Sequence, residues 1–250
     1  MNESLRTPNS ELRTQRAKHA EISEIFSSLQ GEGPYLGSRQ VFVRFGRCNM
    51  HCHYCDEVEM MREDKFWPRT LDDVMTNIEA LSKKEGEPHS VSLTGGEPLF
   101  YTPFLENLLP SLKAKGFKTY LETNGTLPRE LERVIRYTDI VAMDLKPPSS
   151  TGDRAFWKEH KAFLQCALRQ EVFVKVVVTP KTLREDIERC IALIKSVNPK
   201  IPFIFQPQTE DFGISVKALS LIESDFFRVA NESLLDVRVI PQMHKIWGVR

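Results

Sequence analysis

Three cysteines within eight residues are the part of the sequence best suited to carry chemistry. Cys48, Cys52 and Cys55 follow the spacing C-x3-C-x2-C. A short loop with this spacing can supply three thiolates to a metal centre and leave a fourth coordination position open. Two centres fit: an iron–sulfur cluster with one iron open to another ligand, or a structural zinc ion completed by His51 or His53. Zinc sites more often use paired C-x2-C units, and the sequence has no second pair, so the iron–sulfur cluster is favoured.

Sequence patterns around the cysteines predict the elements that position them. The apolar run 41–45 is typical of a buried strand, so the cysteines follow a strand's C-terminal end. Further strands are expected at 21–26, 89–93, 118–122, 139–144, 172–178, 203–206 and 237–240. Helices are expected at 70–84, 102–116, 128–137, 156–168, 183–197 and 216–230, the first capped by Thr70 and the second kinked or divided by Pro110.

This alternation of strands and helices predicts the architecture. Nearly continuous apolar strands that alternate with helices form a parallel sheet covered by helices. About six βα units are too few for a closed eight-stranded barrel, so we expect an α/β fold that forms a partial, open TIM-like barrel. Polar segments follow five of the strands and should converge on one rim, namely 48–56, 95–98, 122–125, 144–146 and 206–209.

The composition limits the cellular compartments and the classes of binding partner that are expected. The 250 residues suffice for one domain with a sizeable core. Lys plus Arg equals Asp plus Glu at 34 each, which argues against nucleic-acid binding through bulk charge. No apolar run reaches membrane-spanning length, and the first twenty residues lack an apolar signal core. We expect a cytoplasmic protein with no direct nucleic-acid or membrane partner, a flexible extension at 1–20 and a single domain at 21–250.

Four reactive residues outside the triplet need separate interpretation. Cys166 and Cys190 lie in helical, largely apolar patterns, which predicts packing thiols. Arg44 is a charge inside an apolar strand, where it either binds a ligand or pairs with a structural carboxylate. His244, near the end of the sequence, belongs either to an exposed tail or to the site.

The cysteine spacing, with Tyr54 before the last cysteine, resembles that of the radical S-adenosylmethionine (SAM) superfamily. A second element agrees, because the segment 94–98 (TGGEP) resembles the superfamily's GGEP motif. The resemblance implies a radical SAM core. In it, Cys48, Cys52 and Cys55 ligate a 4Fe–4S cluster, and SAM chelates the remaining iron.

Longer segments resemble one family of this superfamily, the 7-carboxy-7-deazaguanine synthases. They are 24–33, which contains LQGEG, then 42–48, 122–125 and 241–245. This family converts 6-carboxy-5,6,7,8-tetrahydropterin into 7-carboxy-7-deazaguanine with release of ammonia, a step toward queuosine in tRNA and other 7-deazapurines. The implied mechanism is hydrogen abstraction by a 5′-deoxyadenosyl radical, followed by ring contraction.

Two alternatives remain at this point. A radical SAM activase of a glycyl-radical protein shares the cysteine spacing, but it would not predict the LQGEG loop or the His244-Lys245 pair. A zinc-stapled RNA-binding module would need a basic face, which the neutral composition does not supply.

The family resemblance also implies roles for individual residues. Contacts with SAM are expected from Tyr54, Cys55, Asp56, Gly96, Asp144, Leu145, Lys146, Gln206, Pro207, Gln208 and Thr209. Contacts with the pterin are expected from Leu29, Gln30, Gly31, Arg44, Thr94 and His244, and from a terminal carboxylate at Arg250. The planar guanidinium of Arg44 suits the substrate carboxylate. The family is usually homodimeric, and it requires Mg²⁺ and an external electron donor such as a flavodoxin or ferredoxin.

One position departs from the family pattern. Two residues after the last cluster cysteine the family commonly has Thr or Ser, a hydroxyl ligand for Mg²⁺, whereas this chain has Glu57. A carboxylate is a competent and harder ligand for Mg²⁺, but it adds negative charge beside an anionic substrate. We expect Glu57 to bind the metal; a different substrate is the alternative.

Overall fold

The computed structural model describes residues 17–56, 58, 62–210 and 213–249. Its strands are β1 (His19–Leu29), β2 (Arg39–Phe45), β3 (Trp67–Thr70), β4 (Ser90–Gly95), β5 (Thr119–Thr123), β6 (Ile140–Leu145), β7 (Glu171–Val178), β8 (Phe203–Pro207), β9 (Thr209–Glu210), β10 (Gly213–Ile214) and β11 (Val237–Val239). Nine of them form one sheet in the order β11-β8-β7-β6-β5-β4-β2-β1-β3, and β9 and β10 form a separate hairpin.

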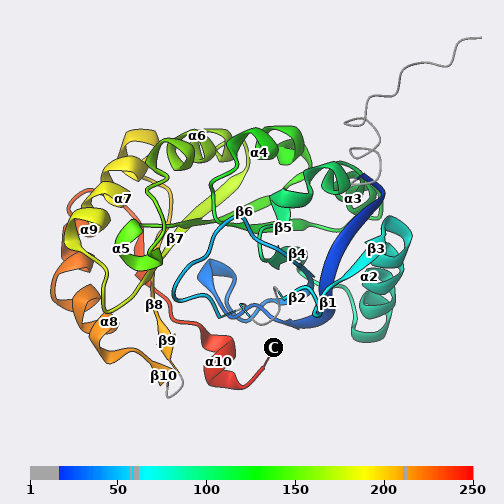
Figure 1. The fold of residues 1–250 in the computed structure, drawn as a ribbon, viewed down its shortest axis with the longest axis horizontal. Coiled ribbons are helices and arrows are strands. Elements are labelled where there is room, and N and C mark those ends of the chain that lie inside the picture. Colours follow the sequence, from blue (N-terminus) through cyan, green and yellow to red (C-terminus); the bar gives the residue numbers. More distant parts are fainter. Residues whose placement is uncertain (1–16, 57, 59–61, 211–212, 250) are drawn as a thin grey trace, which may run out of the picture.

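Helices connect the strands and cover the outer side of the curved sheet (Figure 1). The α-helices are α2 (Leu71–Glu85), α3 (Thr102–Ala114), α4 (Pro128–Val134), α5 (Pro148–Thr151), α6 (Trp157–Ala167), α7 (Arg184–Val197), α8 (Val216–Leu221), α9 (Phe227–Asn231) and α10 (Met243–Trp247). Short 3-10 turns are η1 (Gly33–Tyr35), η2 (Pro98–Tyr101) and η3 (Ile135–Tyr137), and η4 (Ile222–Phe226) is a π-helical turn. Within the described residues, no helix combines the length and apolar character needed to cross a membrane.

The expected open α/β barrel is confirmed. Strands β2, β4, β5, β6, β7, β8 and β11 pair in parallel. The N-terminal edge differs from an all-parallel sheet, because β1 pairs antiparallel with both β2 and β3. The connection from β1 to β2 is only 30–38, and a connection this short favours an antiparallel pair.

Alternation along the strands divides the sheet into two faces. The outward residues form the main core with the helices, for example Leu121, Val141 and Val174, which are all fully buried. The inward residues at the start of the parallel strands form a second apolar cluster that closes the floor of the barrel: Tyr120, Ile140, Ala142, Phe173 and Ile204. Because side chains on one face recur every second residue, the next inward positions toward the C-terminal ends are polar.

Several local predictions have clear outcomes. Thr70 caps α2 through a capping box, accepting from Asp73 N at 3.1 Å while Asp73 accepts from Thr70 N at 3.0 Å. Pro110 does not divide α3. Its neighbours Leu108, Leu109 and Leu112 are buried in the main core, and this packing holds the helix across the lost hydrogen bond.

Other elements differ from the sequence predictions. β1 begins at His19, inside the segment expected to be a flexible extension, because Ala20 pairs with Arg69 of β3 and its side chain is buried in the main core. Residues 1–16 lie outside the described part of the chain. β3, α5, α10 and the β9–β10 hairpin fall in segments for which no helix or strand was predicted, and a π-helical turn interrupts the helix expected at 216–230.

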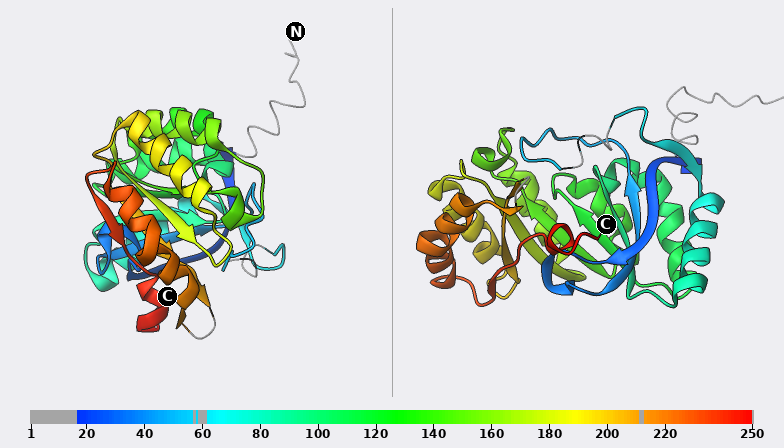
Figure 2. Two further views of the ribbon diagram at one scale, coloured as in Figure 1. Left: turned by 90° about the vertical axis from the view of Figure 1, so that its left-hand side faces the viewer. Right: turned by 90° about the horizontal axis from the view of Figure 1, so that it is seen from below.

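The C-terminal segment connects the two sides of the open barrel. After the edge strand β11 the chain turns back toward the loop that follows β1 (Figure 2). There Met243 N donates to Gly31 O at 2.9 Å, and α10 begins. The gap between the first and last strands is therefore partly covered by the chain itself.

Candidate active site

A cavity lies inside the barrel where the parallel strands end. It is lined by residues of all five polar segments that were predicted to converge, including Cys48, Gly96, Glu122, Asp144 and Gln206. That prediction is confirmed. The wall is completed by residues of β1, the loop after β1 and the C-terminal segment.

The three clustered cysteines share this cavity. Cys48, Cys52 and Cys55 are free thiols that are partly exposed and line its wall. Across the described residues, no three Cys, His, Asp or Glu side chains gather closely enough to hold a single metal ion. A four-iron cluster binds each thiolate to a different iron, so its ligands need not meet at one point.

Burial favours the protonated form of two of these thiols when no metal is bound. Burial raises the pKa of Cys48 to about 11, and the Glu97 carboxylate adds to the effect. Burial also raises the pKa of Cys52. A metal must therefore displace the proton when it takes the thiolate as a ligand. Soft thiolates suit iron–sulfur chemistry.

Two glycines allow close approach of the cysteine loop to the rest of the barrel. A Cβ on Gly96 would lie 1.8 Å from the carbonyl oxygen of Arg47. A Cβ on Gly152, whose φ is +76°, would lie 2.1 Å from the ring of His53. His53 N also donates to Thr151 O at 2.9 Å. The cysteine loop is thus in contact with the end of β4 and with the C-terminal end of α5.

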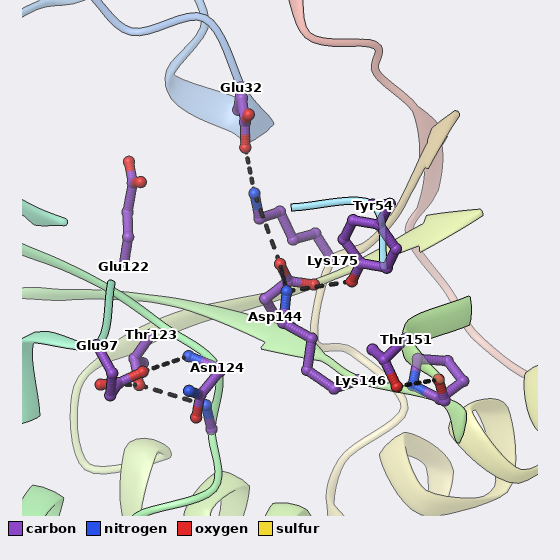
Figure 3. A network of polar contacts seen from close by, with 12 residues as sticks. Glu32, Tyr54, Glu97, Glu122, Thr123, Asn124, Asp144, Lys146, Thr151 and Lys175 are labelled. Atoms are coloured by element: carbon purple, nitrogen blue, oxygen red, sulfur yellow. Dashed lines mark hydrogen bonds and ion pairs between the residues drawn. The ribbon is translucent and has the colours of Figure 1, made fainter. Parts of the chain in front are cut away.

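Four charges alternate in sign along the cavity wall (Figure 3). Lys175 pairs with Glu32, and its Nζ lies 3.9 Å from Asp144 Oδ2. Lys146 Nζ lies 2.7 Å from the same oxygen and donates to the Tyr54 hydroxyl at 3.1 Å. Burial alone would lower the pKa of both lysines, but the adjacent carboxylates raise it above the ordinary value. The lysines are therefore charged.

A second polar group lies toward β1. Gln30 Nε2 donates to Gln40 Oε1 and to Glu122 Oε1, both at 2.9 Å. Thr94 Oγ1 donates to Glu122 Oε2 at 2.7 Å. The residues come from β2, β4, β5 and the loop after β1, so this part of the wall depends on the packed sheet. It offers amide and carboxylate groups to a flat polar ligand.

Arg44 lies between an ion pair and the cavity. Its Nη1 is 3.5 Å from Glu24 Oε2, and its guanidinium lies 5.3 Å from the centroid of the Phe26 ring. Phe26 stacks on Phe42 with ring centroids 5.1 Å apart. Arg44, Phe26 and Phe42 line the cavity, whereas Glu24 does not. Arg44 therefore has the expected carboxylate neighbour and also lines the cavity, so ligand binding by Arg44 stays a prediction.

The C-terminal segment contributes directly to the cavity. His244 packs against Gly31, where a Cβ would lie 2.3 Å from His244 Nδ1. Gln242 Nε2 donates to Glu32 Oε1 at 2.9 Å and to Asp56 Oδ2 at 3.0 Å, and Lys245 Nζ lies 2.7 Å from Asp56 Oδ2. His244 thus belongs to the site and not to a free tail.

Comparison with known proteins identifies the family. Residues 42–200 match the family model of the Radical SAM superfamily. The 7-carboxy-7-deazaguanine synthase of Geobacter sulfurreducens is 39% identical, over 92% of this chain and 97% of that protein. The enzyme of the same name from Archaeoglobus fulgidus is 35% identical, over 92% of this chain and 99% of that protein. The chain belongs to the 7-carboxy-7-deazaguanine synthase family.

A solved structure agrees with the fold. The crystal structure of QueE from Escherichia coli matches 96% of this chain and 100% of its own, with a TM-score of 0.61 and 22% identity. The chain is therefore a radical SAM enzyme, a class that uses a 4Fe–4S cluster and SAM. The relatives do not favour a glycyl-radical activase or a zinc-stapled RNA-binding module.

The residues present fit SAM and the cluster. Three side-chain oxygens in the described cavity wall are buried and have no hydrogen-bond partner: Asp144 Oδ1, Gln206 Oε1 and Thr209 Oγ1. Buried polar atoms are nearly always satisfied, so these acceptors are available to a polar ligand. They lie in the same wall as the three thiols.

Most residues predicted for the site line the cavity. For SAM these are Tyr54, Cys55, Asp56, Gly96, Asp144, Lys146, Gln206, Gln208 and Thr209, and for the pterin Leu29, Gln30, Gly31, Arg44, Thr94 and His244. Leu145 is fully buried in the main core, and Pro207 is buried without lining the cavity. Glu57 and Arg250 lie outside the described residues.

Sequence reasoning missed several cavity residues. Glu32 and Lys175 were not singled out, nor were Phe26, Phe42 and Gln242 as ligand contacts. Lys175 could have been found from alternation, because it is a charge two residues after the inward Phe173 in an otherwise apolar strand.

Proposed function

We propose that this chain converts 6-carboxy-5,6,7,8-tetrahydropterin into 7-carboxy-7-deazaguanine with release of ammonia. One observation carries the proposal: the residues predicted to hold the pterin line the same cavity as the three cysteines, namely Gln30, Gly31, Arg44, Thr94 and His244. The name of the relatives supports this reaction. The product would enter the queuosine or another 7-deazapurine pathway.

The two bound groups would occupy the rim formed by the strand ends. Cys48, Cys52 and Cys55 would hold the cluster. The unpartnered oxygens of Asp144, Gln206 and Thr209 would accept from SAM, together with contacts from Tyr54, Asp56, Gly96, Lys146 and Gln208 and the backbone of Leu145 and Pro207. Bound together, the cluster and SAM supply a carbon radical that abstracts hydrogen, while the protein orients the reactants and excludes water.

The pterin would lie deeper, against β1 and β2. The Arg44 guanidinium can donate two parallel hydrogen bonds to the substrate carboxylate. Gln30 and Glu122 present an amide and a carboxylate to the hydrogen-bonding edge of the pterin, and the Phe26–Phe42 stack gives its ring an apolar wall. His244 would close over the ligand from the C-terminal segment.

Glu57 is the proposed ligand for Mg²⁺. A carboxylate holds Mg²⁺ more strongly than a hydroxyl does, so Glu57→Thr should raise the Mg²⁺ concentration needed for half-maximal turnover. The exposed Glu63→Thr variant, which removes another carboxylate from the same segment, is the matched control. Identical Mg²⁺ dependence of the wild type and Glu57→Thr would contradict this role.

The remaining expectations complete the proposal. An external flavodoxin-like or ferredoxin-like protein would supply the electron, and the enzyme would act in the cytoplasm as a homodimer. Light scattering on the purified protein measures its mass in solution and so tests whether it is a homodimer.

The decisive experiment is an anaerobic assay of the reconstituted protein. It contains SAM, Mg²⁺, a reductant and 6-carboxy-5,6,7,8-tetrahydropterin, and mass spectrometry detects the products. We expect 7-carboxy-7-deazaguanine that depends on every component, and none from Cys52→Ala. Formation of 5′-deoxyadenosine alone would preserve the radical SAM assignment and refute the substrate. If neither product forms on an intact cluster, the glycyl-radical activase becomes the better hypothesis.

A further inference from the structure

A closed ring of hydrogen bonds fixes one side chain next to the first cluster cysteine. Asn124 Nδ2 donates to Asn49 Oδ1 at 2.8 Å. Asn49 Nδ2 donates to Thr126 Oγ1 at 2.8 Å, and Thr126 Oγ1 donates back to Asn124 Oδ1 at 2.6 Å. Each side chain is therefore held at two points, and the ring joins the cysteine loop to the loop that follows β5.

The ring determines which end of the Asn124 amide faces Cys48. Asn124 Oδ1 accepts from both the backbone N–H and the hydroxyl of Thr126, at 3.0 and 2.6 Å. A flipped amide would place its NH₂ group against these two donors, so the orientation is fixed. One hydrogen on Nδ2 is used by Asn49, and the other points to Cys48 Sγ, with an N···S distance of 3.9 Å.

The backbone of Asn124 is also anchored. Its N–H donates to Glu97 Oε2 at 2.8 Å, and its carbonyl oxygen accepts from His160 Nε2 at 3.1 Å. The residue is buried, with 7% of its surface exposed. Gly125, which follows at φ +66°, lies so close to Met143 that a Cβ there would be 2.6 Å from the methyl carbon. Figure 3 shows Asn124 grouped with Glu97 and Thr123.

We propose that Asn124 is a positioning residue that donates a hydrogen bond to the Cys48 thiolate and so raises the reduction potential of the bound cluster. Reduction adds negative charge to a cluster, and a hydrogen bond to a ligand sulfur stabilises that charge. A thiolate is also a stronger acceptor than the neutral thiol. The inference rests on the cluster of the proposed function but not on its pterin substrate.

The first test compares two variants that both break the ring. Asn124→Leu removes the amide donor and leaves a side chain of nearly the same shape. Thr126→Val also breaks the ring, but it keeps the Asn124 amide. Iron and sulfide analysis first establishes that each protein holds its cluster, and a redox titration monitored by EPR then gives the midpoint potential. We expect a more negative midpoint potential for Asn124→Leu and a much smaller change for Thr126→Val. Unchanged potentials, or equal shifts in the two variants, would overturn the proposal.

A second test is made first on the wild type, so its main result does not depend on a variant that folds. Asparagine labelled with ¹⁵N only in the side-chain amide is incorporated, and pulsed EPR of the reduced cluster measures ¹⁵N hyperfine coupling. The coupling should persist in Asn49→Asp, which removes the other nearby amide but keeps an acceptor for Asn124. If the cluster is intact but shows no ¹⁵N coupling, the role of Asn124 is refuted and the proposed function is not affected. A wild type that holds no cluster would refute the proposed function and the inference with it.

Discussion

His160 should make the protein less stable as the pH falls from neutral toward 4. The imidazole is fully buried on α6, beneath the loop that carries Asn124. Burial lowers the pKa of the imidazole to about 4. The charge of Lys146 lowers this pKa further, whereas the Asn124 carbonyl and the Glu159 carboxylate raise it. The Nε2 atom donates to the Asn124 carbonyl oxygen, so the folded protein holds the neutral ring.

The size and sign of the effect follow from proton linkage. Between pH 6.5 and 4 the unfolded chain binds a proton at this histidine that the folded chain does not bind. The contribution of the neutral, buried ring to the free energy of unfolding is therefore complete above pH 6.5 and is lost as the pH falls toward 4. A pKa that falls from 6.5 to about 4 corresponds to about 3 kcal/mol over the whole range, of which about 2 kcal/mol is lost between pH 7 and pH 5.

The assay is urea unfolding of the cluster-free protein at several pH values. His160→Gln keeps an N–H donor for the Asn124 carbonyl but cannot titrate. The free energy of unfolding of the wild type, measured relative to this variant, should fall by about 2 kcal/mol from pH 7 to pH 5. The exposed His19→Gln variant controls for the loss of an imidazole from the surface. A wild-type-to-variant difference that is constant with pH would refute the argument.

Three further predictions concern the cavity. Gly31→Ala places a Cβ 2.3 Å from His244 Nδ1, so hydrogen exchange in 241–249 should speed up; unchanged exchange would contradict the close packing. Lys175→Met leaves Glu32 buried without its cation and should lower the free energy of unfolding by about 3 kcal/mol, measured in urea, with recovery in the double variant that also carries Glu32→Gln. Arg44→Lys removes a bidentate donor and should raise KM for the pterin about tenfold or more; a KM equal to that of the wild type would exclude Arg44 from carboxylate binding.

The helices and strands that could be predicted from the sequence are those determined by residues close together in the chain. The short, β-branched apolar run Val172–Val178 favours a buried strand, and Thr70 with Asp73 satisfies free amides at a helix start. Of the two expected effects of Pro110, a kink or a division of the helix, the division does not occur, because core contacts that the local pattern does not reveal offset the local cost of the proline. β3 was missed because its pairing with β1 is long-range and its side chains are largely exposed.

The residues of the candidate site that follow the strand ends could be predicted from the sequence, whereas several contacts deeper in the cavity could not. Functional residues of α/β folds follow the C-terminal ends of the strands, which predicted that Cys48 and Gln206 share one site although they lie 158 positions apart in the sequence. The partnership of Glu32 with Lys175 could not be predicted, because it depends on how the loop after β1 enters the barrel. Nor could the hydrogen-bonded ring at Asn124, since its geometry requires three side-chain orientations at once.

An open barrel leaves two strand edges where a closed one has none, and unpaired edges are where chains add to one another and aggregate. Here the two end strands of the sheet are short. β3 has four residues and includes Pro68, which has no N–H to offer a further strand. β11 has three residues, with the charged Arg238 at its centre. The enzyme can therefore keep a wide interior for two large ligands while giving a neighbouring chain little backbone on which to polymerise.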